Sequence, residues 1–157
     1  MKRIFLTLIP VVALATPLAA QSVFCLDRQS GQIDQAASQA FADMQSRMDP
    51  QLAQAMAGTW YSETNSPQTG QISRLQISYS ANGALSYQNQ VCDSSGACNT
   101  YQGQGAWAAM QTGNGAFTGI SMISDQGRNQ ECTGFSGQFL DQNTIRSGAG
   151  GIMQRVQ

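Results

Sequence analysis

From Trp60 onwards, apolar and polar residues alternate along the chain, and turn signals recur about every ten residues. A period of two is typical of strands that bury one face, and closely spaced turns predict consecutive antiparallel hairpins. The strongest such signal is Ala81-Asn82-Gly83, a turn between two alternating runs. After the strand that begins at Trp60, strands are predicted over residues 73–79, 85–91, 101–107, 117–123, 128–139, 144–146 and 152–156. Residues 58–157 are therefore predicted to form a mainly β, antiparallel up-and-down barrel of about eight strands, because closure removes exposed edges.

The residues before Gly58 follow a helical pattern instead. Apolar side chains recur at helical spacing across residues 32–48, which predicts an amphipathic helix there. Asp49-Pro50 reads as an N-cap followed by proline at the first helical position, so we expect a second short helix that stops at Gly58. Residues 21–57 are thus predicted to be a helical leader that packs across one end of the barrel. A methionine-rich lid over a ligand is the alternative interpretation.

The first twenty residues have the three parts of a secretory signal peptide. Basic Lys2-Arg3 is followed by an apolar stretch over residues 4–15 and by small residues up to Ala20, so cleavage is expected after Ala20. The apolar stretch is shorter than the ~20 residues that a membrane-spanning helix needs, which argues against an uncleaved anchor. We therefore expect a periplasmic or secreted protein without a membrane span.

All four cysteines lie after this segment, and thiols of exported proteins are usually oxidised. Four cysteines allow three pairings. Cys92 and Cys98 flank a turn-forming segment between two predicted strands, which favours a disulfide between them across a hairpin. Cys25 and Cys132 then pair by elimination and close a long loop. A thiolate metal site is the alternative, but there is no Cys-x-x-Cys and no histidine to complete it, so no metal is expected.

The polar residues of the chain are mainly neutral amides and hydroxyls, because charged residues make up only 11 % of it. Without the two basic residues of the predicted signal peptide, six basic and nine acidic residues remain. This balance argues against nucleic-acid binding, which requires a clustered basic face. The length fits a single domain, which we expect to be a monomer.

No catalytic constellation is visible in the sequence. Histidine is absent and the expected disulfides leave no free thiolate, which excludes Ser-His and Cys-His nucleophile pairs. Gly134-Phe135-Ser136-Gly137 lacks the spacing of a serine elbow. Gly148-Ala149-Gly150-Gly151 lacks the lysine of a phosphate-binding loop. We therefore expect no enzymatic activity and no cofactor.

A short motif links the first predicted barrel strand to the last. Gly58-x-Trp60 opens the β region, and Arg155 lies on the final strand. This arrangement resembles the lipocalin-like (calycin) superfamily, in which a Gly-x-Trp on the first strand packs beside an Arg or Lys on the last. The resemblance covers residues 58–157 and implies that Arg155 stacks on Trp60, a contact that contributes ~0.5–2 kcal/mol. The chain departs from typical secreted lipocalins in its shorter length, in its cysteine positions and in lacking a mid-chain Thr-Asp-Tyr-type motif.

The inward face of the predicted barrel is rich in aromatic residues. Gly103, Gly105, Gly119 and Gly137 share these rows and leave room for a small ligand. In the alternative interpretation, side chains fill the barrel completely and the glycines serve its curvature. The candidate ligand-binding residues are Tyr87, Tyr101, Trp107, Phe117 and Phe135.

Two classes of function follow from these patterns. The first is a non-enzymatic, lipocalin-like periplasmic or secreted protein that binds a small apolar or amphipathic ligand in the barrel. The second is a protein-interaction module of the cell envelope, an inhibitor or assembly factor, with a filled barrel core. An apolar void favours the first class, and a filled interior favours the second.

Overall fold

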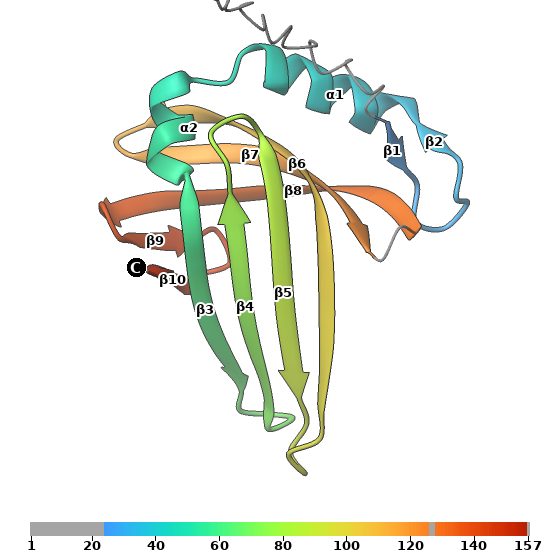
Figure 1. Cartoon of the computed structure of the whole chain (residues 1–157), viewed down its shortest axis with the longest axis vertical. Coiled ribbons are helices and arrows are strands. Elements are labelled where there is room, and N and C mark those ends of the chain that lie inside the picture. Colours follow the sequence, from blue (N-terminus) through green and yellow to red (C-terminus); the bar gives the residue numbers. More distant parts are fainter. Residues whose placement is uncertain (1–23, 126–127, 157) are drawn as a thin grey trace, which may run out of the picture.

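Eight antiparallel strands close into a barrel in the computed structural model, which describes residues 24–125 and 128–156 (Figure 1). Each barrel strand pairs with its neighbour in the sequence, and the last pairs with the first. The strands are β3 (Gly58–Ser66), β4 (Gln71–Tyr79), β5 (Ala84–Cys92), β6 (Cys98–Gly113), β7 (Ala116–Asp125), β8 (Arg128–Asp141), β9 (Thr144–Ser147) and β10 (Ile152–Val156). The predicted mainly β, up-and-down barrel is confirmed. The predicted signal peptide and its cleavage site after Ala20 lie outside the described residues.

The hairpin turns explain why the chain reverses where it does. Asn114 and Gly115, between β6 and β7, have φ angles of 48° and 74°. Two consecutive positive φ angles match the right-handed twist of the flanking strands, and Asn-Gly is the residue pair that accepts them most readily. Gly83, between β4 and β5, also has a positive φ of 87°. Its carbonyl accepts a hydrogen bond from the Trp107 backbone amide at 2.8 Å, so this turn is tied to β6.

Four of the strands continue past the closed part of the barrel. β10 pairs with residues 59–61 of β3, and β7 pairs with β6 only from residue 103 onwards. The far halves of β3–β6 therefore project as a four-stranded sheet, which Figure 1 shows reaching well beyond β8–β10. We call this part the sheet extension; it comprises residues 62–66, 71–75, 89–92 and 98–102.

Two helices and a small hairpin precede the barrel strands in the chain. β1 (Cys25–Leu26) pairs with β2 (Ile33–Asp34), a hairpin that the sequence pattern did not indicate. Helix α1 (Gln35–Ser46) has Asp34 as its N-cap, whose carboxylate accepts a hydrogen bond from the Ala37 amide. Helix α2 (Pro50–Met56) has Asp49 as its N-cap and proline at its first position. None of the helices in the described ranges is long and apolar enough to cross a membrane.

The two helices cover different parts of the barrel. α2 closes one end, where its buried residues join the inward-facing core around Trp60. α1 instead lies on the outer face of β6–β8, where Phe41 is fully buried against Ala108 and Met122. The leader was expected to pack across the barrel end, and α1 departs from this because β6 and β7 are apolar on both faces. Ala108 and Met122 alternate with the inward residues and need a cover of their own.

Both predicted disulfides are present. Cys25 on β1 is bonded to Cys132 on β8, 107 residues away, and fastens the N-terminal hairpin to the barrel wall. Cys92 and Cys98 are bonded across the β5–β6 hairpin at the tip of the sheet extension. Two disulfides fit an extracellular or periplasmic protein, because thiols persist in reducing compartments.

Candidate functional site

The inward side chains at the helix-capped end form a continuous chain of aromatic rings. Neighbouring ring centroids lie 5.1–6.3 Å apart, the separation of rings in direct contact. Trp60 and Trp107 have no solvent exposure, and Phe117 is buried as well. In order of contact the rings are Trp107, Tyr79, Phe135, Phe117, Phe139 and Trp60. This end of the barrel is therefore packed with side chains.

Glycines on the inward rows accommodate these rings. A side chain at Gly119 would collide with the Phe135 ring and would lie 2.7 Å from the carbonyl oxygen of Ala108. At Gly137 it would lie 2.7 Å from the Phe117 ring. At Gly105 it would collide with the backbone of Met122. The space that these glycines provide is thus occupied by neighbouring rings and by close strand packing.

Trp60 and Arg155 meet where the barrel closes. The guanidinium carbon of Arg155 lies 4.3 Å from the Trp60 ring centroid. The guanidinium also donates hydrogen bonds to the carbonyls of Ala55, at 2.6 Å, and of Ala57 at the end of α2. A side chain at Gly58, whose φ is 125°, would lie 2.5 Å from this guanidinium. Arg155 therefore joins the last strand to the first and satisfies carbonyls left free at the helix end.

The five predicted ligand-binding residues are distributed over three places. Trp107, Phe117 and Phe135 belong to the ring chain, and the Trp107 indole donates a hydrogen bond to the Ser80 carbonyl at 3.0 Å. Tyr101 lies on the sheet extension and is 50 % exposed. Tyr87 is half-buried and packs against the core, but it also lines a groove on the outside of the barrel.

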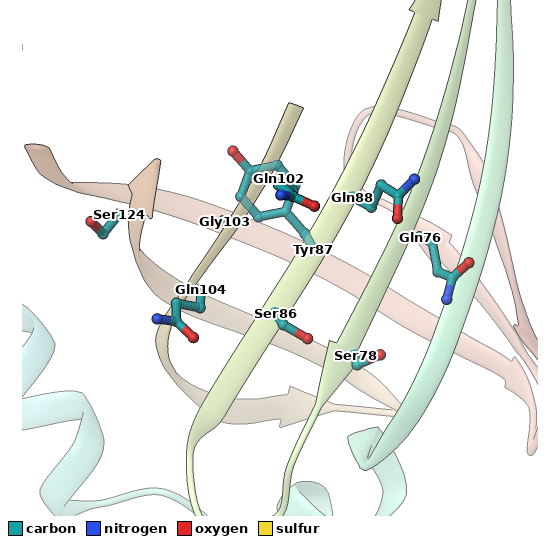
Figure 2. A pocket seen from close by; sticks show the side chains of 9 residues that line it. All are labelled: Gln76, Ser78, Ser86, Tyr87, Gln88, Gln102, Gly103, Gln104 and Ser124. Carbon is teal, nitrogen blue, oxygen red and sulfur yellow. The ribbon is translucent and has the colours of Figure 1, made fainter. Parts of the chain in front are cut away.

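This groove, which we call the glutamine groove, has a volume of about 560 Å³ and opens on the outer face of β4–β7 (Figure 2). The volume lies within the range of ~300–1,000 Å³ that is usual for small-molecule sites. None of the lining side chains carries a formal charge at neutral pH. They are Gln76, Ser78, Ser86, Tyr87, Gln88, Gln102, Gly103, Gln104 and Ser124.

Strand register arranges the groove side chains in two parallel rows. Gln76, Gln88 and Gln102 stand opposite one another on β4, β5 and β6, and Figure 2 shows the three amides side by side. Neighbouring strands are ~4.8 Å apart, so the amides repeat at about that interval across the sheet. The second row consists of Ser78, Ser86, Gln104 and Ser124.

A third row of side chains borders the groove. Unlike the groove amides, its members already form an ion pair and hydrogen bonds with one another. Arg74 forms an ion pair with Glu63 at 2.8 Å and donates a hydrogen bond to the amide oxygen of Gln90 at 3.3 Å. The hydrogen bond from Arg74 holds the pKa of the Glu63 carboxyl below its usual value. Among the described residues, by contrast, the amides of Gln76, Gln88 and Gln102 have no hydrogen-bond partner. The groove amides remain available to a ligand.

Tyr87 borders the groove from the core side of the sheet. The alternation of β5 places its side chain on the same face as Leu85, towards the barrel core. Its partner across the strands is Gly103, which has no side chain to cover the ring, and Figure 2 places the ring beside this glycine. The ring therefore packs on the core side of the sheet, opposite to the face that carries the glutamine side chains.

Two other cavities open near sequence-predicted residues. One, of about 630 Å³, lies beside Arg155 and Phe139. It is a poor anion site because the Arg155 guanidinium is engaged by the carbonyls of Ala55, Ala57 and Gln142. The other, of about 440 Å³, lies beside Phe135 and the turn at residues 147–149.

Within the described ranges, no three His, Cys, Asp or Glu residues are grouped in a way that could hold a metal ion. All four cysteines are in disulfides, so none offers a thiolate. No protein-family model, curated protein or solved structure matches this chain. The glutamine groove is therefore argued from its geometry alone.

Proposed function

We propose that this protein is a non-enzymatic recognition module of an exported, oxidising compartment, with a filled barrel core and its binding surface on the outer face of β4–β7. It corresponds to the interaction module among the two functions that the sequence suggests. One contrast carries the proposal. Aromatic rings fill the interior, whereas the amides of the glutamine groove are exposed and have no hydrogen-bond partner among the described residues.

The filled interior supports recognition at the surface. A ligand at the helix-capped end would have to displace Trp107, Phe117 or Phe135, whose rings occupy the room left by inward glycines. Displacing close-packed rings costs several kcal/mol, because each ring loses most of its contacts. A surface groove imposes no such cost.

The rigidity of the groove also supports this function. Its side chains project from the middle of paired strands, and sites on strands are held more precisely than sites on loops. The ion pair between Glu63 and Arg74 and the disulfide at the tip of the sheet extension both fix the sheet on the tip side of the groove. A rigid site loses little conformational entropy on binding.

A lipocalin-like role, with a small apolar ligand inside the barrel, is the second candidate. It is favoured by the inner face of the sheet extension, where Leu75 and Val91 are only partly buried and Tyr101 is half exposed. An amphipathic molecule placed there would cover apolar surface without entering the ring chain.

Heteronuclear NMR of the isotope-labelled protein distinguishes the two candidates. We expect a soluble envelope extract to shift the side-chain amide signals of Gln76, Gln88 and Gln102. The indole signal of Trp107 should stay in place when oleate is added as an apolar probe. Because the chain has only two tryptophans, Trp60→Phe assigns the indole signals without ambiguity.

Two results would overturn the proposal. A saturable shift of the Trp107 or Leu75 signals with oleate would favour the lipocalin-like candidate. If the extract shifts none of the groove amide signals while the protein remains folded, the groove is not the binding surface.

A further inference from the structure

We infer that the ligand of the glutamine groove is a neutral, hydroxyl-rich saccharide chain. This inference rests on the proposed function and adds the chemical class of the ligand. It follows from the charge, the hydrogen-bonding capacity and the spacing of the side chains in the groove.

The charge of the groove excludes strongly ionic ligands. An anion would need Arg, Lys or a helix N-terminus, and a cation would need carboxylates, but the lining residues provide none of these. The nearest charged row, Glu63 with Arg74, is paired internally at 2.8 Å. A neutral ligand is the one that enters the groove without losing the hydration of a charge.

The hydrogen-bonding groups fit hydroxyls. A glutamine amide presents two donor hydrogens and an acceptor oxygen, and a serine hydroxyl both donates and accepts. A sugar hydroxyl has the same dual character, so it pairs with an amide or a serine in either direction. Four glutamines and two serines on β4–β6 offer many such pairings within one rigid surface.

The spacing of the groove fits a repeating polymer. The amides of Gln76, Gln88 and Gln102 repeat at the strand separation of ~4.8 Å. A β-linked hexose advances an extended glycan by a similar length, so successive sugars can meet successive glutamines.

A peptide ligand suits this surface less well. Peptide recognition by a sheet uses backbone hydrogen bonds along a free strand edge, together with pockets for alternate side chains. The groove lies on a sheet face, where β5 is paired on both sides with β4 and β6. Binding here must be made by side chains, which favours a ligand rich in hydroxyls.

Titration of the isotope-labelled protein with the β-linked glycans cellohexaose and chitohexaose tests the inference. We expect at least one of them to shift the groove amide signals saturably at millimolar concentration. Gln88→Ala should weaken this binding about 2- to 10-fold, since a net hydrogen bond contributes ~0.5–1.5 kcal/mol. Gln154→Ala is the matched control, because Gln154 is an exposed amide on the outer face of β10 and should leave binding unchanged.

Salt provides an independent readout. Binding of a neutral glycan should be the same between about 0.05 and 0.5 M sodium chloride, whereas binding that relies on exposed charges weakens as salt screens them. A strong loss of affinity with salt would contradict the inference.

The failures of the two proposals are distinguishable. If no hexasaccharide binds but a protein fraction of the envelope extract shifts the groove amides, the saccharide inference is wrong and the recognition function stands. If hexasaccharides bind but Gln88→Ala and Gln102→Ala have no effect, the site lies elsewhere and both proposals are wrong.

Discussion

The same strands form two regions of different character, a closed end filled with aromatic rings and a sheet that projects past the closed part. At the helix-capped end, inward residues of β3–β8 bring six aromatic rings into contact and α2 covers them. Past the closed section, β3–β6 continue with mainly polar side chains, although Leu75, Val91 and Tyr101 lie on the inner face, and a disulfide fixes the tip. The comparison indicates that stability is concentrated where the sheet closes. The glutamine groove lies next to the boundary between the two regions, on outer polar side chains that contribute little to folding.

The largest expected difference between the two regions concerns the disulfides. In the chain-entropy model, the Cys25–Cys132 loop of 107 residues contributes ~5 kcal/mol, and the six-residue separation of Cys92 and Cys98 contributes ~2 kcal/mol. Urea unfolding of the two double Cys→Ala variants under non-reducing conditions measures both losses. Equal losses of unfolding free energy in the two variants would contradict the conclusion that stability is concentrated where the barrel closes.

Trp60→Ala should destabilise the protein by ~3–5 kcal/mol, because a fully buried indole is removed and Arg155 loses the ring beneath it. Thermal unfolding followed by circular dichroism measures the effect, with Trp60→Phe as the milder control. A Trp60→Ala variant that melts like the wild type would show that the closure point does not organise the fold.

Alkaline pH should weaken the ring-filled end selectively. Burial raises the pKa of Tyr79 to about 12, from an ordinary value of 10.0. The folded state therefore keeps the Tyr79 proton where the unfolded chain loses it, so this contribution is complete below pH ~10 and is lost as pH rises to ~12. The loss amounts to ~2–3 kcal/mol. Tyr79→Phe should flatten the stability profile in this window; an unchanged profile would contradict the assignment.

Two glycines on adjacent strands test whether rings really fill the barrel. Gly119→Ala should cost ~1–3 kcal/mol, because the new methyl group meets the Phe135 ring and the Ala108 carbonyl. Gly134→Ala is the control, since its methyl group would come no nearer than 4.0 Å to the Gly119 carbonyl oxygen. Similar melting temperatures for the two variants would mean that the interior has room to spare.

The smallest effect is expected at the groove. Gln76→Ala, Gln88→Ala and Gln102→Ala should each remain within ~0.5 kcal/mol of the wild-type stability, because these side chains are exposed and have no partner among the described residues. Denaturant midpoints test this directly. A loss above ~1 kcal/mol would show that the amide row supports the sheet itself.

Local signals in the sequence predicted most of the fold. The period of two, together with turns such as Ala81-Asn82-Gly83, located the eight strands, and the turn between Cys92 and Cys98 indicated their disulfide. These features depend on neighbours in the chain, which is why they are readable from it. The β1–β2 hairpin was missed because two-residue strands carry no period.

The position of α1 and the glutamine groove required three-dimensional information. The run from Gly105 to Met110 is apolar at nearly every position, which is a sign that β6 is buried on both faces, but it does not say what covers the second face. The groove arises from alignment of Gln76, Gln88 and Gln102, which lie 12 and 14 residues apart. This alignment depends on the register between strands, which no single strand sequence reveals.

The contact between Trp60 and Arg155 also constrains the order of events during folding. β10 is the last of the barrel strands in the chain, and β3 is the first. As the chain emerges from its N-terminal end, β3–β9 can form hairpins one after another, each from local segments, while the outer edges of β3 and β9 stay unpaired. Both edges become paired only when β10 docks between β3 and β9. The contact between Arg155 and Trp60 that accompanies this step joins residues 95 positions apart in the chain. Such long-range closure is slow compared with hairpin formation. Until β10 pairs, the free edges of β3 and β9 are open to pairing with neighbouring chains, and β10 covers both of them.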